Sequence, residues 1–262
     1  MRRNARLLGM GWLFHIKMLN RSSFNSVLVV LYPLFFATVA FFMYRAGNPD
    51  ALFYASLGAS VMGIWGATTT AAAGAMQRER WHGTLELLVA APAPFALVLL
   101  PMTIAMSTIG LYSMTTTLLW GRVLFGIRVH IEHWLLFCLS VPATVIAIGM
   151  LGFLLAVSFV RYRTAWALGN LLEYPVWLIC GFLVPLTLFP VWVKPISWVL
   201  APTWGMEAIR ESAQGGTSGV PNTPVPDLLV CLGLGLLYTT IGVLVVDRFL
   251  RAARARAVLS LT

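Results

Sequence analysis

Residues 134–160 read WLLFCLSVPATVIAIGMLGFLLAVSFV and contain no charged side chain. A helix of about 20 apolar residues crosses the hydrocarbon core of a bilayer, so this run predicts a transmembrane helix. The composition of the whole chain agrees, because 59% of its residues are hydrophobic and 10% are charged. Soluble domains carry about 25% charged residues. The sequence therefore predicts a membrane protein whose surface mostly faces lipid.

Four other apolar runs have the length of a membrane-spanning helix, and they lie at residues 26–44, 51–76, 95–120 and 228–246. Residues 164–216 are also largely apolar, but prolines at positions 175, 185, 190, 195 and 202 interrupt them. Proline removes a backbone hydrogen bond from a helix interior, and non-helical backbone at membrane depth must be covered by protein or water. We therefore expect an all-α polytopic membrane protein with six transmembrane helices, the fifth discontinuous and re-entrant.

Lys and Arg residues are distributed unequally between the two sides that this arrangement defines. With six spans the two termini share a side, which holds 13 of the 18 basic residues. Cytoplasmic segments of membrane proteins collect Lys and Arg, so both termini are predicted to be cytoplasmic. The same distribution accounts for the net charge of +9, and we expect no nucleic-acid partner. Residues 26–250 then form a single transmembrane domain, and residues 251–262 a basic cytoplasmic tail.

Residues 1–25 precede the first predicted span and have an amphipathic pattern. On a helical wheel, Arg2, Arg6 and Lys17 share one arc, and most apolar side chains lie elsewhere. Such a helix lies in the headgroup layer of a bilayer, with Trp12 at the interface. The segment is either a membrane anchor or a helix that also packs on a cytoplasmic partner, and the sequence does not choose between these.

A cytoplasmic segment of mixed character connects the second and third predicted spans. Residues 77–94 read QRERWHGTLELLVAAPAP. The leucines make the segment apolar, whereas Glu79 and Glu86 keep it out of the hydrocarbon core. A short helix on the membrane surface that presents its polar face to a cytoplasmic partner fits this pattern. The alternative is an ordinary connector.

These residues resemble the first cytoplasmic loop of the permease subunits of ABC-2 type transporters. The positions that match are Glu79, Arg80, Gly83, Thr84, Leu85, Glu86, Leu88 and Pro92. Trp81 and His82 depart from the family pattern, which bears on the choice of partner. Residues 181–212, GFLVPLTLFPVWVKPISWVLAPTWGMEAIRES, are similar to the re-entrant fifth span and external helices of the same family. That second match rests on Gly181, Pro185, Pro190, Trp192, Pro202, Glu207 and Arg210.

The resemblance implies the membrane-spanning permease of an ATP-driven exporter in a bacterial plasma membrane. Two permeases, either two copies or two paralogues, would pair with two nucleotide-binding ATPase subunits. Residues 83–92 would form the coupling helix that docks on the ATPase. The substrate would be an amphipathic small molecule such as a drug, an antibiotic or a lipid. Export of a polysaccharide or glycolipid, and a membrane-embedded enzyme or assembly factor without an ATPase, stay open as alternatives.

The chain is not expected to hydrolyse ATP itself. A P-loop needs Gly-Lys-Ser/Thr, whereas the two lysines, Lys17 and Lys194, follow Ile16 and Val193. No nucleophile–base pair is evident either. We therefore expect no cofactor on this chain, with ATP and magnesium bound by the partner ATPase.

Glu173 is the most informative polar residue, because it follows the start of the fifth predicted span by several turns. A carboxylate inside a bilayer is costly and usually faces a cavity or pairs with a partner. With Thr69, Asn170 and Tyr174 it is a candidate for the translocation path. A structural hydrogen bond to a neighbouring helix, or an interfacial position, is the alternative.

Three other groups of polar or reactive side chains are given structural interpretations. His130, Glu132 and His133 are expected to form a solvated external turn with no metal site. Glu207, Arg210 and Glu211 are expected to form a charge cluster on the surface. The three cysteines lie in apolar runs and are interpreted as small buried residues, and they are Cys138, Cys180 and Cys231.

Overall fold

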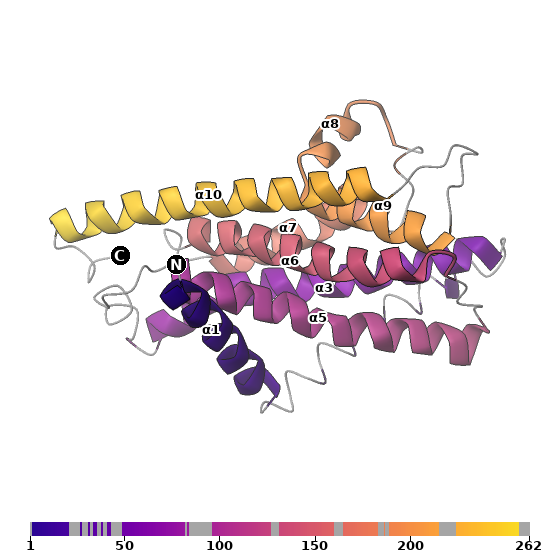
Figure 1. Cartoon of the computed structure of the whole chain (residues 1–262), viewed down its shortest axis with the longest axis horizontal. Coiled ribbons are helices and arrows are strands. Elements are labelled where there is room, and N and C mark those ends of the chain that lie inside the picture. The colour runs from indigo at the N-terminus through magenta and orange to yellow at the C-terminus, as the bar shows by residue number, and fades with distance from the viewer. Residues whose placement is uncertain are drawn as a thin grey trace.

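The computed structural model describes most of the chain and is helical in every regular element that it describes. The described residues are 2–20, 49–81, 83, 96–126, 131–159, 165–182, 186, 189–214 and 224–256, with seven isolated positions between 27 and 42. The helices (Figure 1) are α1 Arg2–Asn20, α3 Pro49–Trp81, α5 Ala96–Phe125, α6 Trp134–Phe159, α7 Ala165–Ile179, α8 Val193–Trp198, α9 Ala201–Gln214 and α10 Val225–Arg256.

The fold class is that of an all-α polytopic membrane protein, as the sequence predicts. Within the described residues, three helices are long and apolar enough to cross a membrane, and they are Ala96–Phe125, Trp134–Ser158 and Val225–Arg248. They coincide with three of the predicted spans. The first predicted span, residues 26–44, lies mostly outside the described residues, so the count of six spans stays a prediction. Helix α10 continues to Arg256, so the first residues of the predicted tail are helical.

Helix α3 packs against α5, α6 and α7. Its 33 residues correspond to about 50 Å at 1.5 Å per residue. Small residues bring its neighbours close, as the sequence predicts. A Cβ added to Gly110 of α5 would lie 2.6 Å from the Ile64 Cα atom. The Thr68 and Ser107 hydroxyls are 2.8 Å apart and join the same two helices.

Helices α3, α6 and α10 run in one direction, and α5 runs antiparallel to them (Figure 1). The end of α3, the beginning of α5, the end of α6 and the end of α10 lie at one end of the bundle, near the beginning of α1. The beginning of α3, the end of α5 and the beginning of α6 lie at the opposite end. The segments that the charge pattern assigns to the cytoplasm thus lie together.

Helix α1 crosses the outside of α5 obliquely (Figure 1). The Trp12 indole Nε1 donates a hydrogen bond of 3.2 Å to the Thr108 hydroxyl, and a Cβ on Gly11 would lie 3.1 Å from Pro101 Cβ. Met10, Leu13 and Phe14 of α1 are exposed, whereas Leu8 and Ile16 are half-buried. The amphipathic helix is therefore attached to the bundle by contacts that include the Trp12 bond, and the interfacial position of Trp12 stays a prediction.

Helix α7 ends within the bundle. Its 15 residues extend about 22 Å, which is less than the hydrocarbon core of about 30 Å. The sequence attributes the interruption to prolines, but Pro175 lies inside the helix. The chain turns instead at Gly181, where φ is +71°. A positive φ is favourable for glycine and strained for other residues, so Gly181 ends the helix.

Helix α9 returns along the inside of the bundle and packs against α6 and α10. At its beginning, the Ala201 N–H donates to the Tyr238 hydroxyl at 3.2 Å, and Tyr238 lies about 20 Å along α10 from Val225. At its end, the His133 N–H donates to the Ser212 carbonyl at 3.1 Å. The resemblance implies external helices over these residues, and α9 runs from the middle of α10 to the end of the bundle where α6 begins.

Candidate functional site

The site lies at the end of α7, where the helix stops among buried side chains. The Phe182 N–H donates to the Trp177 carbonyl at 3.2 Å, and the Gly181 N–H donates to the Leu178 carbonyl at 3.1 Å. These two bonds, with Gly181 at positive φ, form a Schellman motif. The motif satisfies the carbonyls of the last turn, but it leaves the carbonyls of Gly181 and Phe182 themselves in need of donors.

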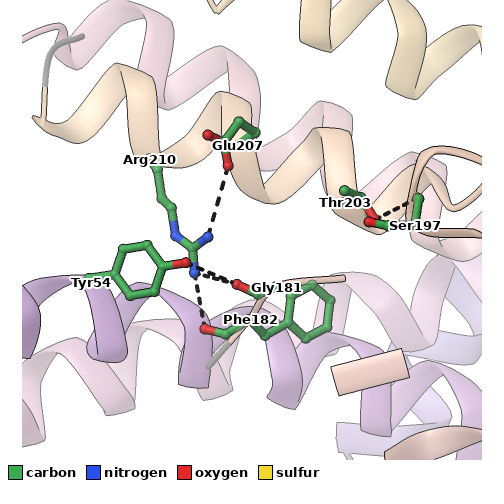
Figure 2. A network of polar contacts seen from close by, with 7 residues as sticks. All are labelled: Tyr54, Gly181, Phe182, Ser197, Thr203, Glu207 and Arg210. Carbon is green, nitrogen blue, oxygen red and sulfur yellow. Dashed lines mark hydrogen bonds and ion pairs between the residues drawn. The ribbon is translucent and has the colours of Figure 1, made fainter. Parts of the chain in front are cut away.

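Arg210 of α9 supplies donors to both carbonyls (Figure 2). Its Nη2 atom donates to the Gly181 carbonyl at 2.7 Å and to the Phe182 carbonyl at 3.0 Å. The residue is 6% exposed. A buried cation is favoured beside a helix C-terminus, because the helix dipole places partial negative charge there. The guanidinium and the end of α7 therefore stabilise each other.

Helix α3 also contributes contacts to this site. The Arg210 guanidinium carbon lies 3.4 Å from the centroid of the Tyr54 ring, which is a cation–π contact. The Tyr54 hydroxyl donates to the Gly181 carbonyl at 3.2 Å. A Cβ on Gly58 would lie 1.7 Å from the Phe182 carbonyl oxygen, so α3 approaches this closely only because residue 58 is glycine. We call Tyr54, Gly181, Phe182, Glu207 and Arg210 the Arg210 cluster.

Glu207 completes the Arg210 cluster from one turn earlier on α9. Its Oε2 lies 3.9 Å from Arg210 Nη1, and the Glu207 side chain is 53% exposed. Exposed ion pairs contribute little to stability, typically about 0–1 kcal/mol. Hydrogen bonds to a charged group contribute about 1.5–3 kcal/mol each. The two carbonyl contacts are therefore the main partners of Arg210, and Glu207 is secondary.

The sequence predicts that Glu207, Arg210 and Glu211 form a charge cluster on the surface, and for Arg210 this prediction is wrong, since the residue is buried. Charged residues at helical spacing are usually solvated, but here the two backbone carbonyls beyond α7 offer a buried arginine its partners. Near the same site, the Ser197 and Thr203 hydroxyls are 3.1 Å apart (Figure 2). The Thr203 hydroxyl also donates to the Ser197 carbonyl at 2.8 Å, which joins α8 to the first turn of α9.

Glu173 lies on α7, two turns before the break, and faces α3. It is 8% exposed, and a Cβ on Gly66 would lie 2.8 Å from its Oε1 atom. Within the described residues, no side chain donates a hydrogen bond to this carboxylate. The Glu173 side chain is therefore buried within the helix bundle, against α3.

The other residues of the predicted translocation path are not all brought together with Glu173. Thr69 is buried, and its hydroxyl donates to the carbonyls of Trp65 and Gly66 within α3. Tyr174 is half-exposed, with its ring 5.1 Å from that of Trp177. Asn170 lies in α7, but its side chain is outside the described residues.

The predicted coupling residues are only partly described. Glu79 and Arg80 belong to the last residues of α3, although their side chains are outside the described part. Gly83 follows in a turn, is exposed and has φ of +66°, which agrees with the tight bend expected there. The remaining predicted residues of this segment lie outside the described residues, and they are Thr84, Leu85, Glu86, Leu88 and Pro92.

The other predicted motif positions and the cysteines have mixed outcomes. Pro190 is exposed and Pro202 is buried in the first turn of α9, whereas Pro185 lies outside the described residues. Cys180 and Cys231 are buried as expected, but Cys138 is exposed. It lies on α6, where apolar neighbours such as Leu135 and Leu139 are exposed too.

Sequence reasoning missed Tyr54 and Gly58, although both belong to the small and aromatic residues of the second predicted span. Their partners are Gly181 and Phe182, which lie more than 120 residues away along the chain. The run of small residues on α3 was a signal that something packs there closely. It did not indicate that the partner would be the end of another helix.

These features define a membrane-embedded helical protein built around an interrupted helix, as in transporter membrane subunits. The family model for ABC-2 type transporters matches residues 8–213, which is more than half of the chain. The chain therefore belongs to the ABC-2 type transporter family, as the sequence predicts. It is a multi-pass membrane permease of an ABC transporter, a subunit that is not itself catalytic. A comparison with characterised proteins gave no significant match to this sequence.

Proposed function

We propose that the chain is the permease of an ATP-driven exporter that moves an amphipathic small molecule out of the cytoplasm or the inner leaflet. The observation that carries this proposal is the match to the ABC-2 type transporter family over residues 8–213. A separate ATPase subunit binds ATP and magnesium. Two permeases, identical or paralogous, complete the pathway in a bacterial plasma membrane. Each has six spans and both termini in the cytoplasm.

The ATPase is proposed to dock on residues 77–94. Helix α3 is continuous from Pro49 to Trp81, and Gly83 follows it in a bend. A continuous helix transmits a displacement along its axis better than a flexible connector does. Movement of a docked ATPase would therefore reach the centre of the bundle through α3.

Co-purification with an ATPase encoded beside this chain tests the docking proposal. Glu86→Arg reverses a charge in the proposed docking segment, and we expect it to reduce recovery of the complex at least about tenfold, which corresponds to about 1.4 kcal/mol. Glu132→Arg is the matched control, since Glu132 is exposed just before α6, on the predicted external side. If the ATPase binds the Glu86→Arg permease as well as the unchanged chain, the docking assignment is wrong.

The cargo proposal rests on Glu173. A buried carboxylate without a described donor favours a passing group that is cationic or rich in hydroxyls. In the purified complex, we expect the lipophilic cation tetraphenylphosphonium to stimulate ATP hydrolysis more than the neutral triphenylphosphine oxide does. Glu173→Gln should abolish this preference. Equal stimulation by both compounds, or an unchanged preference in Glu173→Gln, would count against this role.

A further inference from the structure

The Arg210 cluster joins three parts of the chain that are distant in sequence. Tyr54 belongs to α3, Gly181 and Phe182 follow α7, and Arg210 belongs to α9 (Figure 2). The Arg210 guanidinium bonds to both carbonyls and stacks on the Tyr54 ring. The Tyr54 hydroxyl donates to the same Gly181 carbonyl. One side chain therefore holds two helices against the end of a third.

The chemistry of this contact requires arginine. A guanidinium is planar, so it can lie over an aromatic ring while its N–H groups point outward in the guanidinium's own plane toward acceptors. A lysine ammonium is a compact point charge and has no plane that could stack on the ring. It would keep part of the charge attraction to the carbonyls but lose the stacked arrangement. Arg210 already contacts two carbonyls and the Tyr54 ring and is 6% exposed, which argues against a role in binding an anionic cargo.

The position of the cluster connects the two ends of the bundle. Helix α3 runs unbroken from the cluster to Trp81, beside the proposed docking segment. Helix α9 runs from the middle of α10 to Ser212, whose carbonyl accepts a hydrogen bond from the His133 N–H at the opposite end. Arg210 lies on α9 between these contacts. A displacement of α3 that keeps the cluster intact must carry α9 with it.

We propose that Arg210 is a positioning residue for transport, which makes α3, the end of α7 and α9 move as one body. It transmits the displacement that begins at the ATPase to the far end of the bundle, and this step rests on the proposed function. The attachment of α7 to α3 and α9 by Arg210 does not depend on the proposed function. It can be tested in the permease alone, so the attachment and the proposed function can fail separately.

Cys180 provides a native probe of the attachment. It immediately precedes Gly181, and it is 1% exposed. Cys138→Ser and Cys231→Ser leave it as the only cysteine of the chain, and serine can keep the bond that the Cys231 thiol donates to the Ala201 carbonyl. In this background, the rate of reaction with N-ethylmaleimide measures how often the end of α7 detaches.

We expect Arg210→Ala to raise the reaction rate of Cys180 at least about tenfold. Arg210→Lys should give an intermediate rate, since it keeps a cation beside the carbonyls. Glu207→Gln is the matched control on the same helix, because its side chain is 53% exposed, and its rate should equal that of the parent. An Arg210→Ala rate equal to that of Glu207→Gln would overturn the proposal. If Arg210→Ala does not fold, the comparison of Arg210→Lys with Glu207→Gln decides in the same way.

ATP hydrolysis by the complex distinguishes transmission from simple structural damage. For Arg210→Lys we expect basal hydrolysis and complex recovery to be unchanged. The maximal stimulation by tetraphenylphosphonium should fall several-fold at an unchanged half-stimulating concentration. If complex recovery, basal hydrolysis and stimulation all fall in Arg210→Lys by the same factor, Arg210 has a structural role only. That result would overturn the proposal that Arg210 transmits movement. If tetraphenylphosphonium does not stimulate ATP hydrolysis by the complex with the unchanged permease, the proposed cargo is wrong. The Cys180 reaction rates would then decide whether Arg210 attaches the end of α7.

Discussion

Gly58→Ala should detach the end of α7 from α3. The new Cβ would lie 1.7 Å from the Phe182 carbonyl oxygen and 2.7 Å from the carbonyl carbon. Both atoms belong to the backbone, so no side chain can rotate away. Real Cβ atoms essentially never approach within 3.0 Å of another heavy atom, so the two segments must separate by at least about 1.3 Å.

That separation is large compared with the contacts it disturbs. The bonds from Arg210 to the Phe182 carbonyl and from Tyr54 to the Gly181 carbonyl are 3.0 and 3.2 Å long. An increase of more than an ångström would break either bond. Overpacking costs about 1–3 kcal/mol, and a lost hydrogen bond to the charged Arg210 costs about 1.5–3 kcal/mol. We therefore expect Gly58→Ala to destabilise the permease by about 2.5–6 kcal/mol.

Reversible unfolding in sodium dodecyl sulfate, followed by tryptophan fluorescence, measures this difference, since the chain has 10 tryptophans. Gly74→Ala is the matched control on the same helix, because no described atom lies within 4 Å of its added Cβ. Alanine favours a helix over glycine by about 1 kcal/mol, so the control should be neutral or stabilising. If both variants unfold at the same detergent fraction, the close approach at Gly58 does not exist.

Two further substitutions test the contacts that hold α9 and α1 in place. Tyr238→Phe removes the hydroxyl that accepts from the Ala201 N–H and donates to the Val199 carbonyl, and leaving the buried Ala201 N–H unpaired should cost about 1–3 kcal/mol in the same unfolding assay. A variant as stable as the unchanged chain would show that α9 does not begin beside Tyr238. Trp12→Phe loses the bond to the Thr108 hydroxyl and should cost about 0.5–1.5 kcal/mol, with faster protease cleavage within residues 2–20. Unchanged cleavage would show that α1 is held by other contacts.

The long apolar helices could be predicted from the sequence, because an uninterrupted apolar run of sufficient length is enough to predict a membrane-spanning helix. Residues 134–160 have no charged side chain, and α6 occupies nearly the same range. The tight packing of the second predicted span also followed from its small residues. The prolines of residues 164–216 correctly indicated an interrupted helix. In each case the signal is local, and so it is visible in a short window of sequence.

The site itself could be predicted only in part. Glu173 and Gly181 were recognisable as an intramembrane carboxylate and a motif glycine. The burial of Arg210 was not, because its partners are two backbone carbonyls that every residue possesses. The pairing of Gly58 with Phe182 depends on how α3 and α7 cross, and side-chain patterns do not encode the register of two distant helices. Pro175 misled for a related reason, since it lies within α7 and the turn occurs at Gly181.

The unbroken course of α3 also limits how this chain can change in length. Each residue of an α-helix advances the chain by about 100° around the axis. A single inserted residue between Gly58 and Trp81 would keep the contact with Phe182 and turn everything beyond it by that angle. The Gly83 bend would then point to a different side of the bundle. Insertions of three or four residues nearly restore the direction, so homologues of different length in α3 should differ by such steps.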